Sequence, residues 1–405
     1  MVTAAIAAQQ KASRPSQAPC SEADFSAVTK QVQASRAALL ALPIGDGMQP
    51  DVSAEGQHAI SAMKESLGDF VNAHMRCAPL NPDIESIKRE LSESAHAFTM
   101  PTGQIRKEDI PPDFGKYGFQ LWFDVQSAHE NRLLSITAAF DIECGTDAIL
   151  FVFSSDGGSW HEVLRWQSKP YSSIKDAFWS FDSRISPADN SGRWYVVTKH
   201  IAPWCSSTWS GIGYEVLRPQ PGSLNPKVLL SQDDFMWWGN EDFGTLTANA
   251  NDFDVRFHST SIDGGVHNRV WIRHFTVSGD TVTRVQPVAV SPRDFVDEWL
   301  ISPWKSARGW SSKGASEQLR QEHEAFSRAE NSSHRLLSFG TIHLCSDDHN
   351  HFQVELVEET GPKFDIDQSF YFQVVGKNAY TMTGVSKTPD PRCGGQDLLD
   401  EMSTK

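Results

Sequence analysis

The sequence lacks the long apolar runs that cross membranes. No stretch of its 405 residues approaches the roughly 18 consecutive apolar residues that a spanning helix needs. Basic blocks are absent too: Lys and Arg number 36 against 51 Asp and Glu, which gives a formal charge of −15. Because the apolar runs are too short, we expect no transmembrane segment. Because an acidic chain repels a phosphate backbone, we expect no nucleic-acid partner.

Motifs of several catalytic and cofactor-binding classes are also missing. The chain has no Gly-x-Ser-x-Gly elbow, no phosphate-binding loop and no Rossmann glycine pattern. No Cys-x-x-Cys or Cys-x-x-His spacing indicates zinc, and the polar segment around His343, His349 and His351 has the composition of a solvated hairpin turn. We therefore expect no cofactor, no metal and no catalytic residue of a familiar enzyme class.

The six cysteines are even in number, and each predicted region of the chain holds one pair. They are Cys20, Cys77, Cys144, Cys205, Cys345 and Cys393. This distribution is typical of disulfides formed in an oxidising compartment, and we predict sequential pairing. Residues 1–19 contain an Ala-x-Ala pattern and are either the remnant of a signal peptide or disordered. We expect an exported protein, secreted or periplasmic.

Residues 20–100 are expected to form a small α-helical bundle. Apolar residues recur at steps of three and four over 21–42 and 53–76, and a third helix follows. The first two helices are joined by a short Pro/Gly loop and should pack antiparallel. Cys20 and Cys77 then lie at the same end of the bundle, within bridging reach. Residues 101–115, rich in proline and charge, are expected to be a linker.

Residues 116–290 are predicted to form a tryptophan-rich antiparallel β domain. The candidate strands are short, aromatic or β-branched, and separated by Gly, Asn, Asp and Pro. No periodic segment of helix length alternates with them, which excludes a doubly wound fold. The strands are predicted at 119–125, 133–142, 148–154, 161–167, 178–185, 194–201, 212–217, 227–230, 245–248, 253–258, 270–277 and 281–288. The fold class is mainly β, with a propeller-like or a β-sandwich architecture.

An internal repeat runs through the β domain. Three hairpins share the order strand, glycine turn, strand, and their turn glycines are Gly158, Gly222 and Gly279. Each interval between these glycines holds about four candidate strands. We therefore expect four-stranded units of roughly 60 residues, somewhat longer than the 40–50 residues of a typical propeller blade.

Residues 291–395 change from strands to helices and back. Helices are predicted at 292–300 and 316–329, and strands at 336–344, 352–357, 370–375 and 380–385. The last two strands flank Gly376, so this part is either an α+β segment or a fourth β repeat with an inserted helical part. Trp299, Trp304 and Trp310 are expected to dock the helical part onto the β domain. Residues 396–405 are expected to be a tail.

One hairpin turn carries a resemblance to a known family. The segment 154–160, SSDGGSW, resembles the Asp box of sialidase-like β-propellers, whose pattern is Ser-x-Asp-x-Gly-x-Thr-Trp. Ser154, Asp156 and Gly158 match the pattern, whereas Trp160 comes one residue early and the Thr is absent. In that family the box is a structural turn between the last two strands of a blade. The resemblance implies a propeller-like fold and does not imply glycosidase chemistry.

The tryptophans divide into core and candidate ligand-binding residues. All 13 lie between Trp122 and Trp310. Trp166, Trp194 and Trp271 alternate with apolar residues inside predicted strands, so we expect them in the core. Trp204 and Trp209 flank Cys205 in a predicted loop, where their rings either pack on a disulfide or are exposed for stacking on a ligand.

The segment 233–242 is the strongest functional candidate. Paired carboxylates beside Trp rings suit a sugar-cleaving site, which needs an acid, a nucleophile or base, and flat faces for stacking. The alternative is a loop whose rings pack into the core while its carboxylates face water. The candidate ligand-binding residues are Trp204, Trp209, Asp233, Asp234, Trp237, Trp238, Glu241 and Asp242.

Two functions follow as expectations. Export, disulfides and an acidic surface, together with the missing catalytic motifs, favour a non-enzymatic binding or interaction module. Its partner would be a carbohydrate or a protein of the cell envelope. The alternative is a carbohydrate-active hydrolase that uses carboxylates near a Trp-rich cleft.

Overall fold

The described residues of the chain are mainly β. The computed structural model describes residues 22–43, 51–96, 116–129, 132–143, 145–174, 177–202, 209–237, 243–263, 268–329, 335–346, 350–360 and 365–398. These residues form four antiparallel four-stranded sheets, with helices before the first sheet and before the last. The mainly β fold, the N-terminal helices and the helical segment before the final strands are therefore confirmed.

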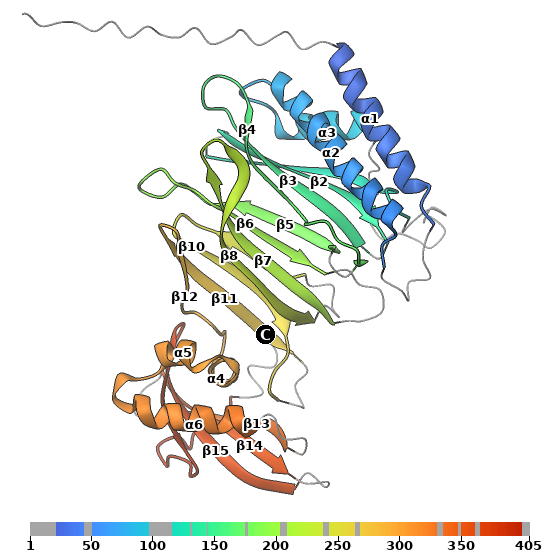
Figure 1. Ribbon diagram of the computed structural model, residues 1–405. Coiled ribbons are helices and arrows are strands. Elements are labelled where there is room, and N and C mark those ends of the chain that lie inside the picture. Colours follow the sequence, from blue (N-terminus) through green and yellow to red (C-terminus); the bar gives the residue numbers. More distant parts are fainter. Residues whose placement is uncertain are drawn as a thin grey trace, which may run out of the picture.

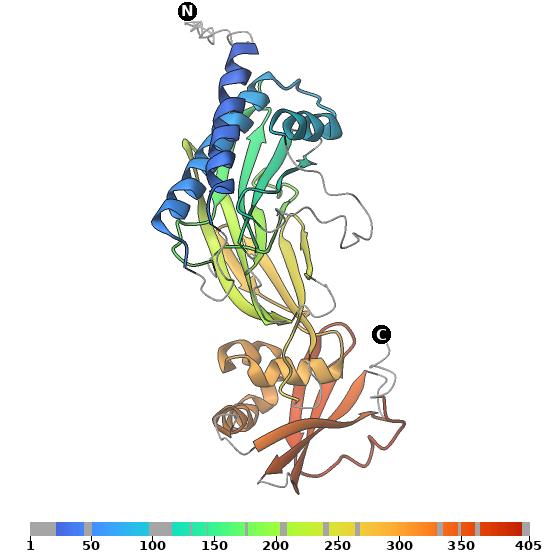
Figure 2. The same cartoon turned by 90° about the vertical axis from the view of Figure 1, so that its right-hand side faces the viewer.

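Three helices precede the first sheet and cover one of its faces (Figure 2). They are α1 (Glu22–Leu40), α2 (Ala54–Cys77) and α3 (Ile84–Ser94). The second helix begins where the sequence predicts, because the Ser53 hydroxyl accepts a hydrogen bond from the Gly56 amide. Its apolar side buries Met63, Leu67 and Phe70 against the sheet. None of the described helices combines the length and apolar character that crossing a membrane requires.

Each sheet is a meander of four strands that are consecutive in the sequence. The first sheet contains β1 (Leu121–Ala128), β2 (Leu133–Ile142), β3 (Gly145–Ser154) and β4 (His161–Gln167). The second contains β5 (Ser180–Ile185), β6 (Val196–Ile201), β7 (Trp209–Gln220) and β8 (Ser223–Trp237). The third contains β9 (Thr245–Ala248), β10 (Asp252–Ser259), β11 (Arg269–Ser278) and β12 (Thr281–Arg284). These strands match the predicted segments, and β7 and β8 extend well beyond them.

The turn glycines lie at equivalent places in the sheets. Gly158, Gly222 and Gly279 lie between the third and fourth strands of their sheets, Gly376 is the last residue of the third strand of its sheet, and each of the four has a positive φ. Glycine adopts this backbone conformation without the steric cost of a side chain. The repeat of strand, glycine turn and strand is thus a repeat of whole four-stranded sheets, including the fourth.

The first three sheets stack face to face along the molecule in the order of the chain (Figure 1). The residues between the first and second sheets include Leu150, Val152, Leu164, Val196 and Leu217. A larger core between the second and third sheets includes Val197, Ile212, Tyr214, Phe253 and Phe275. The sheets form an open row, so the described residues do not close into the ring of a propeller (Figures 1 and 2).

The last sheet packs against the second group of helices. The helices are α4 (Pro292–Ile301), α5 (Trp304–Ala307) and α6 (Ser316–Ala329), and the strands are β13 (Arg335–Leu344), β14 (His351–Thr360), β15 (Asp365–Gly376) and β16 (Tyr380–Ser386). Trp299 packs on Phe372 of this last sheet rather than on the third sheet. Trp310 does reach the third sheet, because its ring centroid lies 5.2 Å from the guanidinium of Arg284.

The turn that resembles the Asp box has the expected local geometry. The Ser154 hydroxyl accepts a hydrogen bond from the Asp156 amide, and Gly158 has a φ of +86°. The Trp160 ring is buried, and its indole nitrogen donates to the carbonyl of Pro79. The turn therefore ties the end of the first sheet to the helical part.

Candidate functional site

A cleft of about 950 Å³ opens between the first and second sheets. One wall comes from β4 and the segment that follows it, and the other comes from β6, β7 and β8. The apolar clusters between the two sheets reach this region through Trp166 and Phe178. The side chains that line the cleft include polar, aromatic and aliphatic groups.

Three residues form one row across the second sheet at the base of the cleft. His200 on β6 pairs with Gly213 on β7, which in turn pairs with Asp233 on β8. A Cβ atom at Gly213 would lie 2.4 Å from His200 Nε2 and 2.8 Å from Asp233 Oδ1. Only glycine fits between them, because any other residue would displace the imidazole. The missing side chain lets the two flanking groups converge above the strand.

Glu215 connects the two walls of the cleft. It lies two residues beyond Gly213 on β7 and so projects from the same face of the sheet. Its carboxylate accepts hydrogen bonds from the Trp166 indole nitrogen at 2.5 Å and from the Ser231 hydroxyl at 3.1 Å. Trp166 belongs to β4 of the first sheet, so this contact fixes the aromatic wall relative to the acidic one.

His200 is a largely buried imidazole between these carboxylates. Burial lowers its pKa, and the negative charges of Glu215 and Asp233 oppose that shift. The imidazole is therefore mostly neutral at pH 7. Its Nδ1 atom is buried and has no hydrogen-bond partner in the described structure, so Nε2 remains as its polar atom toward the cleft.

Aromatic rings form the opposite side of the cleft. Trp166 stacks on Phe178 and Phe181, with ring planes 25° and 24° apart. The Phe178 ring also lies against the His200 imidazole, at a centroid distance of 4.6 Å. Trp166, expected in the core, packs against the apolar clusters between the first two sheets, but it is only partly buried and also lines the cleft. The site thus combines flat apolar faces with two carboxylates and a neutral imidazole.

The structure separates the two neighbouring aspartates of the candidate segment. The strand β8 continues through Trp237, where a loop was the alternative expected from the sequence. Asp233 lines the cleft, and Asp234 projects from the other face of the strand. The two carboxylates therefore cannot act on one ligand.

Asp234 belongs to a buried ionic network. Its carboxylate accepts hydrogen bonds from the Tyr214 hydroxyl at 2.9 Å and from Arg273 at 2.9 Å and 3.0 Å. Arg273 also donates to Glu298 on α4, at 2.9 Å. Burial alone would raise the pKa of Glu298, but its arginine partners lower it to about 2. Asp234, on β8 of the second sheet, thus binds Arg273 of the third sheet, which in turn binds α4 through Glu298.

Trp237 is not among the described residues that line the cleft, and the side chain of Trp209 lies outside the described structure. Trp237 ends β8 and is partly buried, and Trp209 begins β7 opposite it. Trp204, Trp238, Glu241 and Asp242 lie outside the described residues, as do Cys20, Cys144 and Cys205.

Sequence reasoning missed most of the residues that the cleft brings together. His200, Glu215 and Phe178 were not singled out, and Trp166 was assigned to the core. One signal was present: Gly213 lies inside the predicted strand 212–217. Glycine inside a strand often marks a place where another group approaches the backbone closely.

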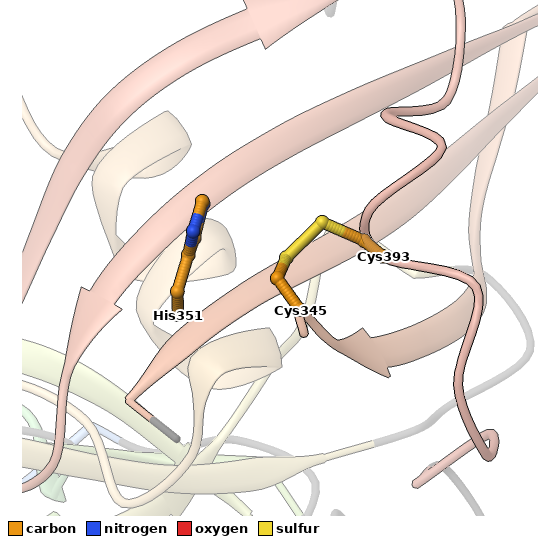
Figure 3. Close-up of side chains that lie close together, drawn as sticks. All are labelled: Cys345, His351 and Cys393. Carbon is orange, nitrogen blue, oxygen red and sulfur yellow. A yellow bond between two sulfur atoms is a disulfide. The ribbon is translucent and has the colours of Figure 1, made fainter. Parts of the chain in front are cut away.

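A second cluster lies on the last sheet. Cys345 and Cys393 form a disulfide, as the sequential pairing predicts, and His351 lies beside them (Figure 3). One donor atom from each of the three residues lies within 4.8 Å of the others. The two sulfur atoms are bonded to each other, and His351 shares a 2.9 Å hydrogen bond with Gln373. The cluster is therefore a structural disulfide that joins the residue after β13 to the segment after β16, with a histidine beside it.

Cys77 is also disulfide-bonded, and no described cysteine is free. This agrees with an oxidising compartment. No protein-family model and no curated protein matches the sequence, so function has to be inferred from the cleft itself.

Proposed function

We propose that the chain is a binding protein and that the cleft between the first and second sheets holds a small organic ligand. The row of His200, Gly213 and Asp233 carries this proposal. An imidazole nitrogen and a carboxylate oxygen both lie within 3 Å of the position that a Cβ of Gly213 would occupy, at the base of an open cleft. A core would fill such a position with apolar atoms.

The composition of the cleft supports the proposal. Ligand sites are concave, of roughly 300–1,000 Å³, and lined by aromatic groups with a few placed polar ones. Here the aromatic groups are Trp166 and Phe178, and the polar ones are His200, Glu215 and Asp233. The hydrogen bond from Trp166 to Glu215 fixes both walls before a ligand arrives, which reduces the ordering cost of binding.

Fluorine NMR of protein labelled with 5-fluorotryptophan tests this proposal. The signal of Trp166 is assigned with a Trp166→Phe variant, and the signal of the fully buried Trp299 serves as an internal control. Fragments that include amines, alcohols, sugars and carboxylic acids are added one at a time. A ligand in the cleft shifts the Trp166 signal and leaves that of Trp299 in place. If no fragment does so, the chain is not a binding protein of this kind.

Hydrolysis of a carbohydrate is the second candidate function. Asp233 and Glu215 lie on the same face of adjacent strands as diagonal neighbours, a relationship that spans about 7–8 Å in antiparallel pairs. Inverting glycosidases use carboxylates at about this separation. The test is release of a chromophore from aryl glycosides: hydrolysis that disappears in both Glu215→Gln and Asp233→Asn would favour this function over binding alone.

We further propose that the protein is exported, either secreted or periplasmic. The Cys345–Cys393 disulfide and the disulfide-bonded Cys77 support this, since such bonds persist in oxidising compartments. A protein of the cell envelope or a carbohydrate would then be within reach as a partner.

We also propose that the first three sheets are a propeller-like stack. Two observations support a relationship to sialidase-like propellers. The sheets pack face to face in chain order, and the Asp-box-like turn at 154–160 lies between the last two strands of its sheet. The first of these observations also separates the stack from a β-sandwich, which has two sheets.

A further inference from the structure

We propose that the ligand of the cleft carries a primary ammonium group on an apolar or aromatic stem. This rests on the proposed function, because it names the chemical class that the same site would bind. The inference comes from the charge balance of the cleft, from its hydrogen-bond acceptors and from its aromatic wall.

The negative charges in the cleft have no cationic partner among the described residues. Glu215 accepts hydrogen bonds from two neutral groups, Trp166 and Ser231. The carboxylate of Asp233 forms no hydrogen bond or ion pair within the described part of the chain. His200 is mostly neutral at pH 7, because burial lowers its pKa.

Two basic residues line the cleft, but neither neutralises these carboxylates. Arg165 alternates with Trp166 along β4 and projects from the opposite face of the first sheet. There it donates to Glu162 through two hydrogen bonds of 2.7 Å, and its guanidinium lies close to Gly68 of α2. Lys169 lies on the exposed rim of the cleft, in the segment after β4. Neither basic residue therefore forms an ion pair with Glu215 or Asp233 among the described residues.

The hydrogen-bonding groups favour a donor as the ligand. A carboxylate can only accept hydrogen bonds, and an alkylammonium group has three N–H donors and no acceptor. Asp233, which is exposed to solvent on the edge strand β8, supplies unused acceptor oxygens to the cleft. An ammonium placed there would also lie near the rings of Trp166 and Phe178, and the face of an aromatic ring attracts a cation.

The rest of the cleft suits an apolar stem. Pro226 and Val228 line the wall formed by β8, and Val228 is half exposed to solvent. A stem that packs between these side chains and Trp166 would remove apolar surface from water. A ligand with a charged head and an apolar stem therefore matches the two ends of the cleft.

A matched pair of probes tests this inference. The cation 2-phenylethylammonium and the neutral 2-phenylethanol have the same stem, and glucose represents neutral polyols. Binding to the labelled protein is followed at the Trp166 fluorine signal. We expect the cation to bind at least tenfold more tightly than the alcohol, and we expect Asp233→Asn to reduce this preference to about threefold or less. Asp124→Asn, which removes the same charge from a half-exposed residue of β1 outside the cleft, should leave the preference intact.

The outcomes separate the two proposals. If 2-phenylethanol or glucose binds as tightly as the cation, the cleft is a binding site but the ammonium inference is wrong. The inference is equally contradicted if Asp233→Asn leaves the preference for the cation unchanged. If none of the three probes shifts the Trp166 signal at concentrations up to about 20 mM, the ammonium inference is contradicted. The binding function is contradicted as well only if every fragment of the wider set also leaves the Trp166 signal in place.

Discussion

His200 and Asp233 meet above Gly213, with an imidazole nitrogen and a carboxylate oxygen 2.4 Å and 2.8 Å from the place where a side chain would begin. The three residues belong to three neighbouring strands of one sheet. The positions of the imidazole and the carboxylate therefore depend on the absence of a side chain at Gly213. This relationship makes the site sensitive to substitutions that hardly change the surface of the protein.

The titration of His200 depends on its acidic neighbours. Burial lowers its pKa, and the charges of Glu215 and Asp233 raise it. Asp233→Asn should therefore lower the pKa of His200 further, because it removes one of the two charges that raise it. NMR of the imidazole C–H signals across pH measures this, with His200→Gln for assignment. Asp156→Asn, in a hairpin turn, should leave the pKa of His200 unchanged. An unchanged or increased pKa of His200 in Asp233→Asn would show that the Asp233 carboxylate does not raise the pKa of the imidazole.

Asp141 gives the N-terminal part of the protein a pH-dependent stability. Burial raises the pKa of this carboxyl to about 7, although the Gln120 amide donates to it and Arg36 lies nearby. The folded state thus holds a proton that the unfolded state releases near pH 4. Stability should fall as the pH rises from about 4 to 7, by at most about 4 kcal/mol.

The variant Asp141→Asn tests this pH dependence. It keeps an acceptor for the Gln120 amide and carries no charge, so it should be more stable than the parent protein at pH 8 and similar to it at pH 4. Urea denaturation at the two pH values gives the comparison. A parent protein whose stability rises between pH 4 and 7, with no such rise in the variant, would contradict the role of Asp141.

Glu298 should be a strong determinant of stability where α4 meets the third sheet. Its carboxylate is 1% exposed and accepts hydrogen bonds from Arg269, Arg273 and Arg284. Glu298→Gln leaves two buried arginines and the partly buried Arg284 without that charge and should cost about 3–5 kcal/mol of unfolding free energy. The exposed Arg320, which pairs with acids on α6, is the control: Arg320→Ala should cost less than about 1 kcal/mol. Equal effects in chemical denaturation would argue against a buried network.

The disulfides make a prediction for peptide mapping. Sequential pairing predicts the linked peptides Cys20–Cys77, Cys144–Cys205 and Cys345–Cys393 in a non-reducing digest. Loss of the Cys345–Cys393 bond in a double serine variant should lower stability by about 2–4 kcal/mol. Free thiols in the isolated protein, or crossed pairs, would contradict both the pairing and the proposed export.

Much of the fold could be predicted because its signals are local. The strand β2 (Leu133–Ile142) and the helix α6 (Ser316–Ala329) have the predicted bounds, since their apolar and aromatic patterns match their periods. The turn glycines also marked the sheet repeat. The strand β8 was predicted too short, because Asn225, Pro226 and two aspartates disfavour a strand locally. Pairing with β7 overrides that preference.

The cleft could not be predicted because its contacts are not local. Trp166 and Glu215 are 49 residues apart and belong to different sheets, so their hydrogen bond depends on how the sheets stack. Side chains alternate between the two faces of a strand, so Asp233 and Asp234 could have been assigned to opposite faces. The predicted strand 227–230, however, ended before both residues. The orientation of His200 toward the cleft depends on the glycine on the neighbouring strand.

The most direct test of the binding site compares two glycines on one strand. A Cβ at Gly213 would strike His200, whereas a Cβ at Gly211 would meet, among the described residues, only Ala202, at an ordinary 3.6 Å. With the tightest of the three probes, Gly213→Ala should weaken binding at least tenfold, and Gly211→Ala should change it by less than about threefold. Circular dichroism confirms that both variants are folded. Equal affinities for the two variants would contradict a binding site above Gly213.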